Sequence, residues 1–388
     1  MPSPLRLFHC ALTLTFLMSV STTALLSAED DDGFVPMFNG RDLSGWRHVN
    51  TAPSTWAVKD GMLICSGKPI GELRTERMYQ NFVLELEWRH MVPKGNAGVF
   101  VWADDITAPG VPFHRGIEVQ VLENAYGKAK WFTTHGDIFP IHGAKMTPIN
   151  GRGGSRAFPT EERSKPSPEW NHYRIECRDG DISLAVNGKV VTRGKDCSPS
   201  KGYICLESEG GVVHYRNVRI KELPDTPVKP EDIAIAERGY RSIYTGVDLS
   251  GWKRTAAVNK AWKVSDWVLA GSASGNEPGP SLTTTETFKD YDFIIDMRLK
   301  SKDSVATILP RGTNGGPSTS DIAEHLAPQG KWTRIEGQVR GNRVTLTANR
   351  QPVKTEFTLK DSTSPAPLAI QTTSGSVDFA NLYVRSAK

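Results

Sequence analysis

Cysteine is scarce in this chain, with five residues among 388, and none of them forms the paired C-x-x-C spacing of a thiolate zinc site. The spacing therefore predicts no metal held by several cysteines. Four cysteines follow the N-terminal region: Cys65, Cys177, Cys197 and Cys205. An even number in an exported protein permits disulfides, although the spacing does not fix how they pair.

An excess of charge of one sign is also missing. The 47 basic and 43 acidic residues are mixed along the sequence and leave a formal net charge of +4. A protein that tracks a phosphate backbone would carry a basic stripe, and none is present. Nucleic acid is therefore not an expected partner.

Apolar runs of membrane-spanning length are absent as well. The run over 11–20 follows Arg6 and precedes small residues, which is the order of a cleavable export signal. A retained anchor is the alternative, but a spanning helix needs about 20 apolar residues. We expect residues 1–28 to be removed, no integral span in the mature chain, and a secreted, periplasmic or cell-envelope location.

Helical periodicity is scarce, and strand patterns take its place. Residues 82–88 alternate apolar with polar or charged side chains, and so do residues 182–186 before the Asn187-Gly188 turn. Many short strands separated by glycine turns predict an all-β protein built from antiparallel β-sandwiches.

The sequence contains the same domain pattern twice. FNGRDLSGW, ending at Trp46, recurs as YTGVDLSGW, ending at Trp252, and later motifs recur in the same order. A segment rich in proline and charge joins the copies and is typical of a short extended linker. We expect a first sandwich over 34–223, a linker over 224–235 and a second, shorter sandwich over 236–386.

The copies differ mainly in one segment. Trp46 to Trp170 spans 124 positions, whereas the matching Trp252 to Trp332 spans 80, so the first copy has 44 additional residues. They lie between Trp88 and Trp170. Long excursions on a rigid sandwich usually carry function, so we expect the site in the first copy and an accessory role for the second.

A strand beginning at Gly116, GIEVQVLEN, supplies the acidic candidates. Alternation places Glu118 and Gln120 on the outer face, and a β-bulge at Leu122 would bring Glu123 onto the same face. The spacing resembles the E-x-D-x-x-E pattern of sandwich-fold β-glucanases, with glutamine in place of the aspartate. We predict Glu118 and Glu123 to be catalytic and Gln120 to bind sugar; a solvated strand face is the alternative.

Two charged residues outside this strand are further candidates for substrate binding. Arg74, in GELRTER, has a guanidinium that can hold a sugar hydroxyl or a developing oxyanion, with a surface ion pair as the alternative. Glu87 lies on the outward phase of its strand and would extend the polar surface.

The additional segment also holds histidine and tryptophan candidates. His135 and Asp137 lie two residues apart, a spacing that suits proton transfer by His135 or a divalent cation near Asp137, although no recognised ligand motif is matched and a structural loop is the alternative. Trp102 and Trp131 are predicted to stack on a pyranose ring, with burial in the core as the alternative.

The motifs FNGRDLSGW, GELRTE, FVLELEWR, GNAGVFVW, GIEVQVLEN, VNGKVV and YRNVRIKEL, in this order, resemble the 3-keto-disaccharide hydrolase domain family. The resemblance covers about 34–223 and implies a concanavalin A-like sandwich of the jelly-roll type. The second copy matches only in its framework. The family implies secreted enzymes that act on sugars oxidised at carbon 3.

The resemblance implies hydrolysis of 3-keto-disaccharides or 3-keto-glycosides by elimination and hydration. A ketone at carbon 3 acidifies the proton on carbon 2, so a carboxylate can remove it before the glycosidic oxygen leaves and water adds. We assign Glu118 as base, Glu123 or His135 as acid, and Arg74 to the enolate oxygen. The alternatives are an ordinary glycosidase of the glucanase type and a non-catalytic carbohydrate-binding module.

Overall fold

The computed structural model describes residue 1 and residues 32–275, 277–312, 315–360 and 364–387. Contacts divide the chain into Met1–Gly33 and Phe34–Lys388, and all strands lie in the second unit. Apart from Met1, the predicted signal over residues 1–28 falls outside the described residues. Within the described part, no helix is long and apolar enough to cross a membrane.

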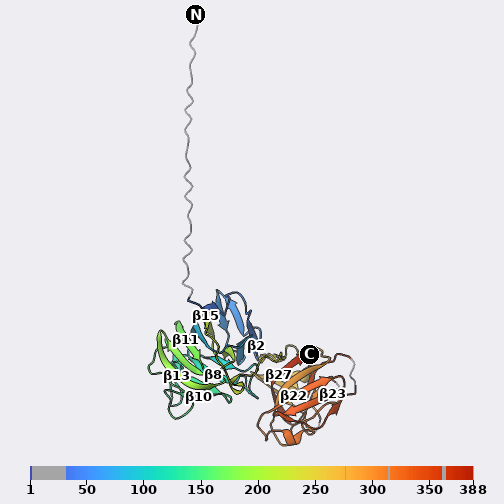
Figure 1. Cartoon of the computed structure of the whole chain (residues 1–388). Coiled ribbons are helices and arrows are strands. Elements are labelled where there is room, and N and C mark those ends of the chain that lie inside the picture. The colour runs from blue at the N-terminus through green and yellow to red at the C-terminus, as the bar shows by residue number, and fades with distance from the viewer. Residues whose placement is uncertain (2–31, 276, 313–314, 361–363, 388) are drawn as a thin grey trace. The chain divides into compact units, whose positions relative to one another are not determined.

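Strands dominate the described residues and fall into two groups, coloured blue to green and orange to red in Figure 1. The helical elements are short: α1 (Ala256–Ala261), η1 (Asn124–Tyr126), η2 (Pro230–Asp232) and η3 (Ala323–His325). All strand pairs between named strands are antiparallel, so the predicted all-β antiparallel class is confirmed.

The first group, which we call the first sandwich, has a nine-stranded sheet and a six-stranded sheet. The larger sheet runs β10 (Lys145–Pro148), β13 (Lys189–Ser198), β12 (Asp181–Val186), β11 (Asn171–Arg178), β6 (Phe82–His90), β15 (Val213–Glu222), β4 (Met62–Cys65), β3 (Trp56–Lys59), with β1 (Val35–Pro36) beside β15. The smaller sheet runs β2 (Trp46–Val49), β5 (Gly71–Thr75), β14 (Tyr203–Ser208), β7 (Asn96–Ala103), β8 (Gly116–Leu122), β9 (Ile138–Ile141).

The second group, the second sandwich, pairs a nine-stranded sheet with a three-stranded sheet. The larger sheet runs β17 (Trp262–Ser265), β18 (Val268–Ser272), β27 (Ser376–Ser386), β20 (Tyr291–Leu299), β22 (Thr333–Arg340), β23 (Arg343–Ala348), β24 (Gln351–Pro352), with β16 (Arg241–Ser242) beside β27 and β25 (Phe357–Thr358) beside β23. The smaller sheet runs β19 (Leu282–Thr283), β26 (Ala369–Ser374), β21 (Val305–Leu309).

Each sandwich buries the inward side chains of its two sheets in a core of its own. In the first, Leu84 and Tyr173 of the larger sheet join Val99, Val119 and other residues of the smaller sheet in one cluster. A separate cluster fills the second sandwich. Alternate residues of each strand face this core, so the remaining residues of the smaller sheets project from the outer face.

The two sandwiches share a strand order. The path β3-β4-β15-β6-β11-β12-β13 in the first corresponds to β17-β18-β27-β20-β22-β23-β24 in the second. Their smaller sheets differ, because six strands lie in the first and three in the second. The residue limits of the domains remain a prediction, since Phe34–Lys388 forms one unit.

The four cysteines among the described residues are free thiols, and all are buried. Cys65 and Cys177 belong to the first core, whereas Cys205 lies on the outer face of the smaller sheet under a small apolar cluster. Burial keeps all four away from solvent.

Candidate active site

A cavity of about 370 Å³ lies on the outer face of the smaller sheet of the first sandwich. Its wall combines acids, one arginine, one histidine and several aromatic rings. The lining residues are Asn96, Phe113, Glu118, Gln120, Leu122, Tyr126, Trp131, Phe132, Phe139, Ile141, His142, Arg156, Glu207 and Glu209. This combination of an apolar wall and converging polar groups is typical of a small-molecule site.

Strand β8 supplies two of the predicted residues. Its apolar residues Ile117, Val119 and Val121 enter the core, as alternation predicts, and Glu118 and Gln120 project into the cavity. The predicted orientation of this strand is therefore confirmed.

A glycine on the neighbouring strand makes room between two acids. Gly98 of β7 lies opposite Gln120, and a Cβ atom added to it would meet Glu207 Oε2 at 2.9 Å and Glu118 Oε1 at 3.0 Å. These two oxygens are therefore no more than 5.9 Å apart. Any side chain at position 98 would occupy the space that the two carboxyl groups share.

Glu207 and Glu209 were missed as site residues by sequence reasoning. Both come from the YICLESEGG motif, in which Ile204 and Leu206 face the core and the intervening residues face outward. The second copy carries LAIQTTSGS at the matching place and lacks both acids. That loss of acids between the copies is the pattern that would have identified them.

Glu118, Glu207 and Glu209, which we call the carboxyl cluster, have unusual protonation equilibria. Burial and the nearby Glu209 raise the pKa of both Glu118 and Glu207 well above the ordinary value. Burial raises the pKa of Glu209 to about 7, against a hydrogen bond from Asn96. Near neutral pH, Glu209 is the member best placed to exchange a proton, and burial favours the protonated form of the other two.

Amides fix the positions of two cavity residues. Gln120 Nε2 donates to Asn96 Oδ1 at 2.9 Å, and Asn96 Nδ2 donates to Glu209 Oε2. Because Asn96 bonds to both, the side chains of Gln120 and Glu209 are held at fixed positions relative to each other.

Arg156 brings a positive charge to the cavity. Its guanidinium lies 3.4 Å from the centroid of the Phe139 ring and donates to Asp137 Oδ2 at 3.1 Å. Its charge opposes the rise in the pKa of Glu118. An arginine held by a buried carboxylate and an aromatic face is rigid, which suits it to stabilise a developing anion.

Aromatic rings form the apolar side of the cavity. Trp131 is 68% exposed and packs on Phe132 with ring centroids 4.5 Å apart. His142 stacks on Phe113 at 6.4 Å, and burial lowers the pKa of its imidazole. The structure thus brings Trp131 to the same cavity as Glu118 and Gln120.

Glu123 does not share the outer face of β8. The register from Ile117 to Leu122 is continuous, so the predicted bulge at Leu122 is absent. Glu123 instead follows the strand and accepts hydrogen bonds from the backbone N–H groups of Lys94, Ala125 and Ser167 at 2.7–3.0 Å. Although burial opposes them, these bonds lower the pKa of Glu123. The contacts make it a cap for the turn at η1.

His135 and Asp137 are also engaged outside the cavity lining. His135 Nδ1 lies 2.6 Å from Ser164 Oγ, and its Nε2 is 3.5 Å from Glu162. The Asp137 carboxylate accepts from Thr133 and from Arg156. Since both carboxylate oxygens have donors, Asp137 acts as the anchor of Arg156, and its contacts do not favour a cation.

Arg74 and Glu87 lie in other places. Arg74 is buried, with its guanidinium 4.0 Å from the centroid of the Tyr203 ring and paired with Glu237. Glu87 projects from the outer face of the larger sheet, pairs with Arg216, and lines a different cavity of about 470 Å³. Neither residue reaches the carboxyl cluster's cavity.

Trp102 belongs to the core. Its side chain has no exposed surface, lies against Phe82 with ring centroids 6.4 Å apart, and donates from Nε1 to the carbonyl of Gln80 at 2.9 Å. The predicted stacking of Trp102 on a sugar is therefore wrong in this structure. A register shift between β7 and β14 and a φ of 54° at Trp102 interrupt the alternation and turn the ring into the core.

Residues 33–221 match the model of the 3-keto-alpha-glucoside-1,2-lyase-like domain. The first sandwich is a domain of this family. The resemblance found in the sequence is thereby confirmed, and the entire cavity lining falls inside the lyase-like domain.

Individual proteins show more distant similarity. A 3-keto-disaccharide hydrolase of Bacteroides thetaiotaomicron is 25% identical over 239 residues, which are 50% of this chain and 80% of that protein. A solved structure from Parabacteroides distasonis, named as a glycosyl hydrolase, is 22% identical with a TM-score of 0.38 and covers 50% of this chain and 94% of its own. A Bacillus licheniformis β-glucanase is 12% identical with a TM-score of 0.34, over 49% and 97%.

Proposed function

We propose that the lyase-like domain cleaves the glycosidic bond of 3-keto-disaccharides or 3-keto-glycosides by elimination, followed by hydration. The observation that carries the proposal is the carboxyl cluster at the gap over Gly98, where one acid has a pKa of about 7 and burial raises the pKa of the other two well above the ordinary value. Neighbouring carboxyl groups with different pKa values suit a site in which one group accepts a proton and another donates one.

Glu209 is the proposed base, in place of Glu118. Its pKa near neutrality gives it both an ionised population and enough basicity to remove the proton on carbon 2, which the ketone acidifies. Its link to Asn96 keeps one oxygen in place. The electrons of the broken C–H bond move into an enolate on the carbon 3 oxygen.

Arg156 and Glu118 complete the elimination. The guanidinium stabilises the enolate oxygen, and the protonated Glu118 donates to the glycosidic oxygen as the bond at carbon 1 breaks. Water then adds to carbon 1 of the unsaturated ketone and a proton returns to carbon 2, so the two steps together amount to hydrolysis.

Gln120 and Trp131 are the proposed sugar contacts. The amide of Gln120 is held by Asn96 and can bind a hydroxyl, and the exposed face of Trp131 can stack on the ring. The export signal predicted over residues 1–28 supports a location outside the cytoplasm for this reaction.

An ordinary retaining glycosidase has one supporting observation. Glu118 and Glu207 approach within 5.9 Å, and retention uses carboxyl groups about 5–5.5 Å apart. A nucleophile must be ionised, however, and burial raises the pKa of both acids. The elimination mechanism is therefore favoured, because it needs only one ionised member of the cluster.

The test incubates the mature chain with a 3-keto-disaccharide and, separately, with its unoxidised parent in deuterated water. We expect cleavage of the keto-sugar alone and deuterium at carbon 2 of the keto product. Cleavage of the parent without exchange would overturn the elimination mechanism, and absence of cleavage with retained binding would support the binding-module alternative.

A further inference from the structure

Three side chains with metal-binding atoms meet on the outer face of the smaller sheet, apart from the residues that line the cavity. Glu72 comes from β5, Cys205 from β14, and His114 from the segment between β7 and β8. One ligand atom from each lies within 4.8 Å of the others. We call them the Glu–His–Cys group.

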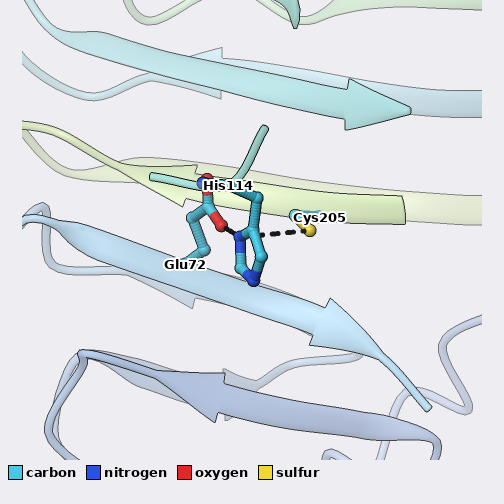
Figure 2. Close-up of side chains that lie close together, drawn as sticks. All are labelled: Glu72, His114 and Cys205. Atoms are coloured by element: carbon cyan, nitrogen blue, oxygen red, sulfur yellow. Dashed lines mark hydrogen bonds and ion pairs between the residues drawn. The ribbon is translucent and has the colours of Figure 1, made fainter. Parts of the chain in front are cut away.

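The group is closed off from solvent. His114, Glu72 and Cys205 each have no exposed surface. Figure 2 shows the imidazole of His114 between the Glu72 carboxylate and the Cys205 sulfur. His114 Nδ1 contacts Glu72 Oε2 and lies 3.8 Å from Cys205 Sγ.

The polar atoms of the group have few partners apart from one another. Glu72 Oε1 accepts from the backbone N–H of His114 at 3.3 Å, whereas Glu72 Oε2, which points into the group, contacts His114 Nδ1. The other ring nitrogen, His114 Nε2, has no hydrogen-bond partner among the described residues. A buried carboxylate without full compensation is costly, so a buried polar atom in this state calls for an explanation, such as an ion.

We propose that the Glu–His–Cys group binds a divalent transition-metal ion, with Zn²⁺ as the ion that fits best. Carboxylate oxygen, imidazole nitrogen and thiolate sulfur are the three ligand types of zinc sites, and a water molecule would complete the tetrahedron. One carboxylate and one thiolate carry two negative charges, which a divalent ion neutralises in the closed interior.

Cys205 would bind the ion as a thiolate, because the thiolate is the form of cysteine that ligates metals. A bound cation deprotonates a coordinating thiol, so metal uptake near neutral pH releases about one proton.

The position of the group gives the ion a structural role. Glu72 lies opposite Glu207 in the pairing of β5 with β14, and Cys205 is two residues before Glu207 on the same strand. An ion there would tie β5, β14 and the segment ending at His114 together beside the carboxyl cluster. This inference does not depend on the proposed reaction.

The test begins with the full chain, purified without a histidine tag and analysed for metals. After chelation and removal of the chelator, it is titrated with Co²⁺ and then Zn²⁺. We expect one ion per chain, a near-ultraviolet thiolate-to-cobalt band with visible bands of tetrahedral Co²⁺, and release of about one proton.

Matched cysteine variants locate the site. Cys205→Ala should weaken Co²⁺ binding by more than about 100-fold and remove the thiolate band, whereas Cys177→Ala, another buried thiol, should keep both. Wild-type protein that neither contains nor takes up a metal would overturn the proposal, since that measurement needs no variant. A thiolate band that survives in Cys205→Ala would also overturn it.

Discussion

Strand β14 of the first sandwich and strand β26 of the second have equivalent places in their sheets. Leu206 and Ile370 each enter the core of their own sandwich. Eleven positions later, Asn217 and Asn381 both adopt left-handed backbone, with φ of 52° and 50°. This backbone conformation is uncommon for residues other than glycine, so its presence at the same distance from Leu206 and Ile370 supports the alignment of the two strands.

The corresponding outer faces carry different side chains. Where the first sandwich has Glu207 and Glu209, the second has Gln371 and Thr373. None of the replacements can ionise. The second sandwich also lacks a described strand equivalent to β8, which carries Glu118.

The neighbouring strand differs at one decisive position. Val99 lies opposite Leu206 in the first sandwich and Ile308 lies opposite Ile370 in the second, so Gly98 corresponds to Thr307. The first sandwich thus has acids where the second has uncharged side chains, and a glycine where the second has a threonine. The comparison teaches that a few residues on the outer face of a sheet can give one sandwich a site that the other lacks. The residues that form the two cores need not change.

The largest expected effect comes from giving the first sandwich the side chains of the second. Glu207→Gln together with Glu209→Thr should lower kcat/KM on a 3-keto-disaccharide by about 10²–10⁴-fold, because the proposed base is lost. Folding should be retained, since burial favours the uncharged form of Glu207 and glutamine has nearly the same shape.

The measurement is initial-rate kinetics beside thermal unfolding. Glu176→Gln, on the larger sheet away from the cavity, serves as the control and should leave both unchanged. Turnover within a few-fold of wild type in the double variant would show that Glu207 and Glu209 take no part in the chemistry.

The next effect concerns the gap between the acids. Gly98→Thr should lower turnover by about 10²-fold, because the new side chain displaces Glu118 and Glu207 by about 1 Å or more from their positions. Thr307→Gly in the second sandwich is the matched control and should not change turnover. Equal activity of the two variants would mean that the gap over Gly98 is not needed.

The pH dependence gives a smaller effect. If Glu209 must be ionised, kcat/KM should fall about tenfold per pH unit below an apparent pKa near 7, which belongs to the coupled cluster. In the Glu209→Gln variant, the remaining kcat/KM should no longer fall as the pH decreases below 7. A wild-type profile that is flat from pH 5 to pH 8, a range of about three units around the Glu209 pKa, would exclude Glu209 as base.

Stability should respond to the same titration. The folded-state pKa of Glu209 is above its ordinary value of 4.5, so the folded state binds this proton more tightly than the unfolded state. The stabilisation is present below about pH 4.5 and is lost as the pH rises through 7. Urea unfolding of wild type and Glu209→Gln across this range should show that only the wild type loses this contribution.

The alternation of apolar and polar residues within one strand predicted part of the site. It missed the part that depends on which strands pair with each other. The alternation in β8 was enough to place Glu118 and Gln120 outward. The convergence of Glu118 with Glu207 depends on β14 pairing with β7 and β7 with β8, which joins segments about 90 residues apart and leaves no local pattern.

Glu123 was misplaced for a local reason. Alternation does not reveal that a strand ends. The Glu123 carboxylate is bound by one backbone N–H group of the following turn, that of Ala125, and by two from other loops, those of Lys94 and Ser167. Tryptophan gave a mixed result: the segment that holds Trp102 and Trp131 was identified, but only the structure separates the core ring from the exposed one.

The smallest expected effect uses that pair of tryptophans. Trp131→Ala should leave the free energy of unfolding unchanged and raise KM for the keto-sugar about fivefold, from a stacking loss of about 1 kcal/mol. Trp102→Ala should instead cost about 3–5 kcal/mol of unfolding free energy, because it empties a core position. Urea unfolding and kinetics on both variants separate the two roles, and a Trp131→Ala enzyme with unchanged KM would remove this ring from the sugar contacts while leaving the carboxyl cluster as the centre of the site.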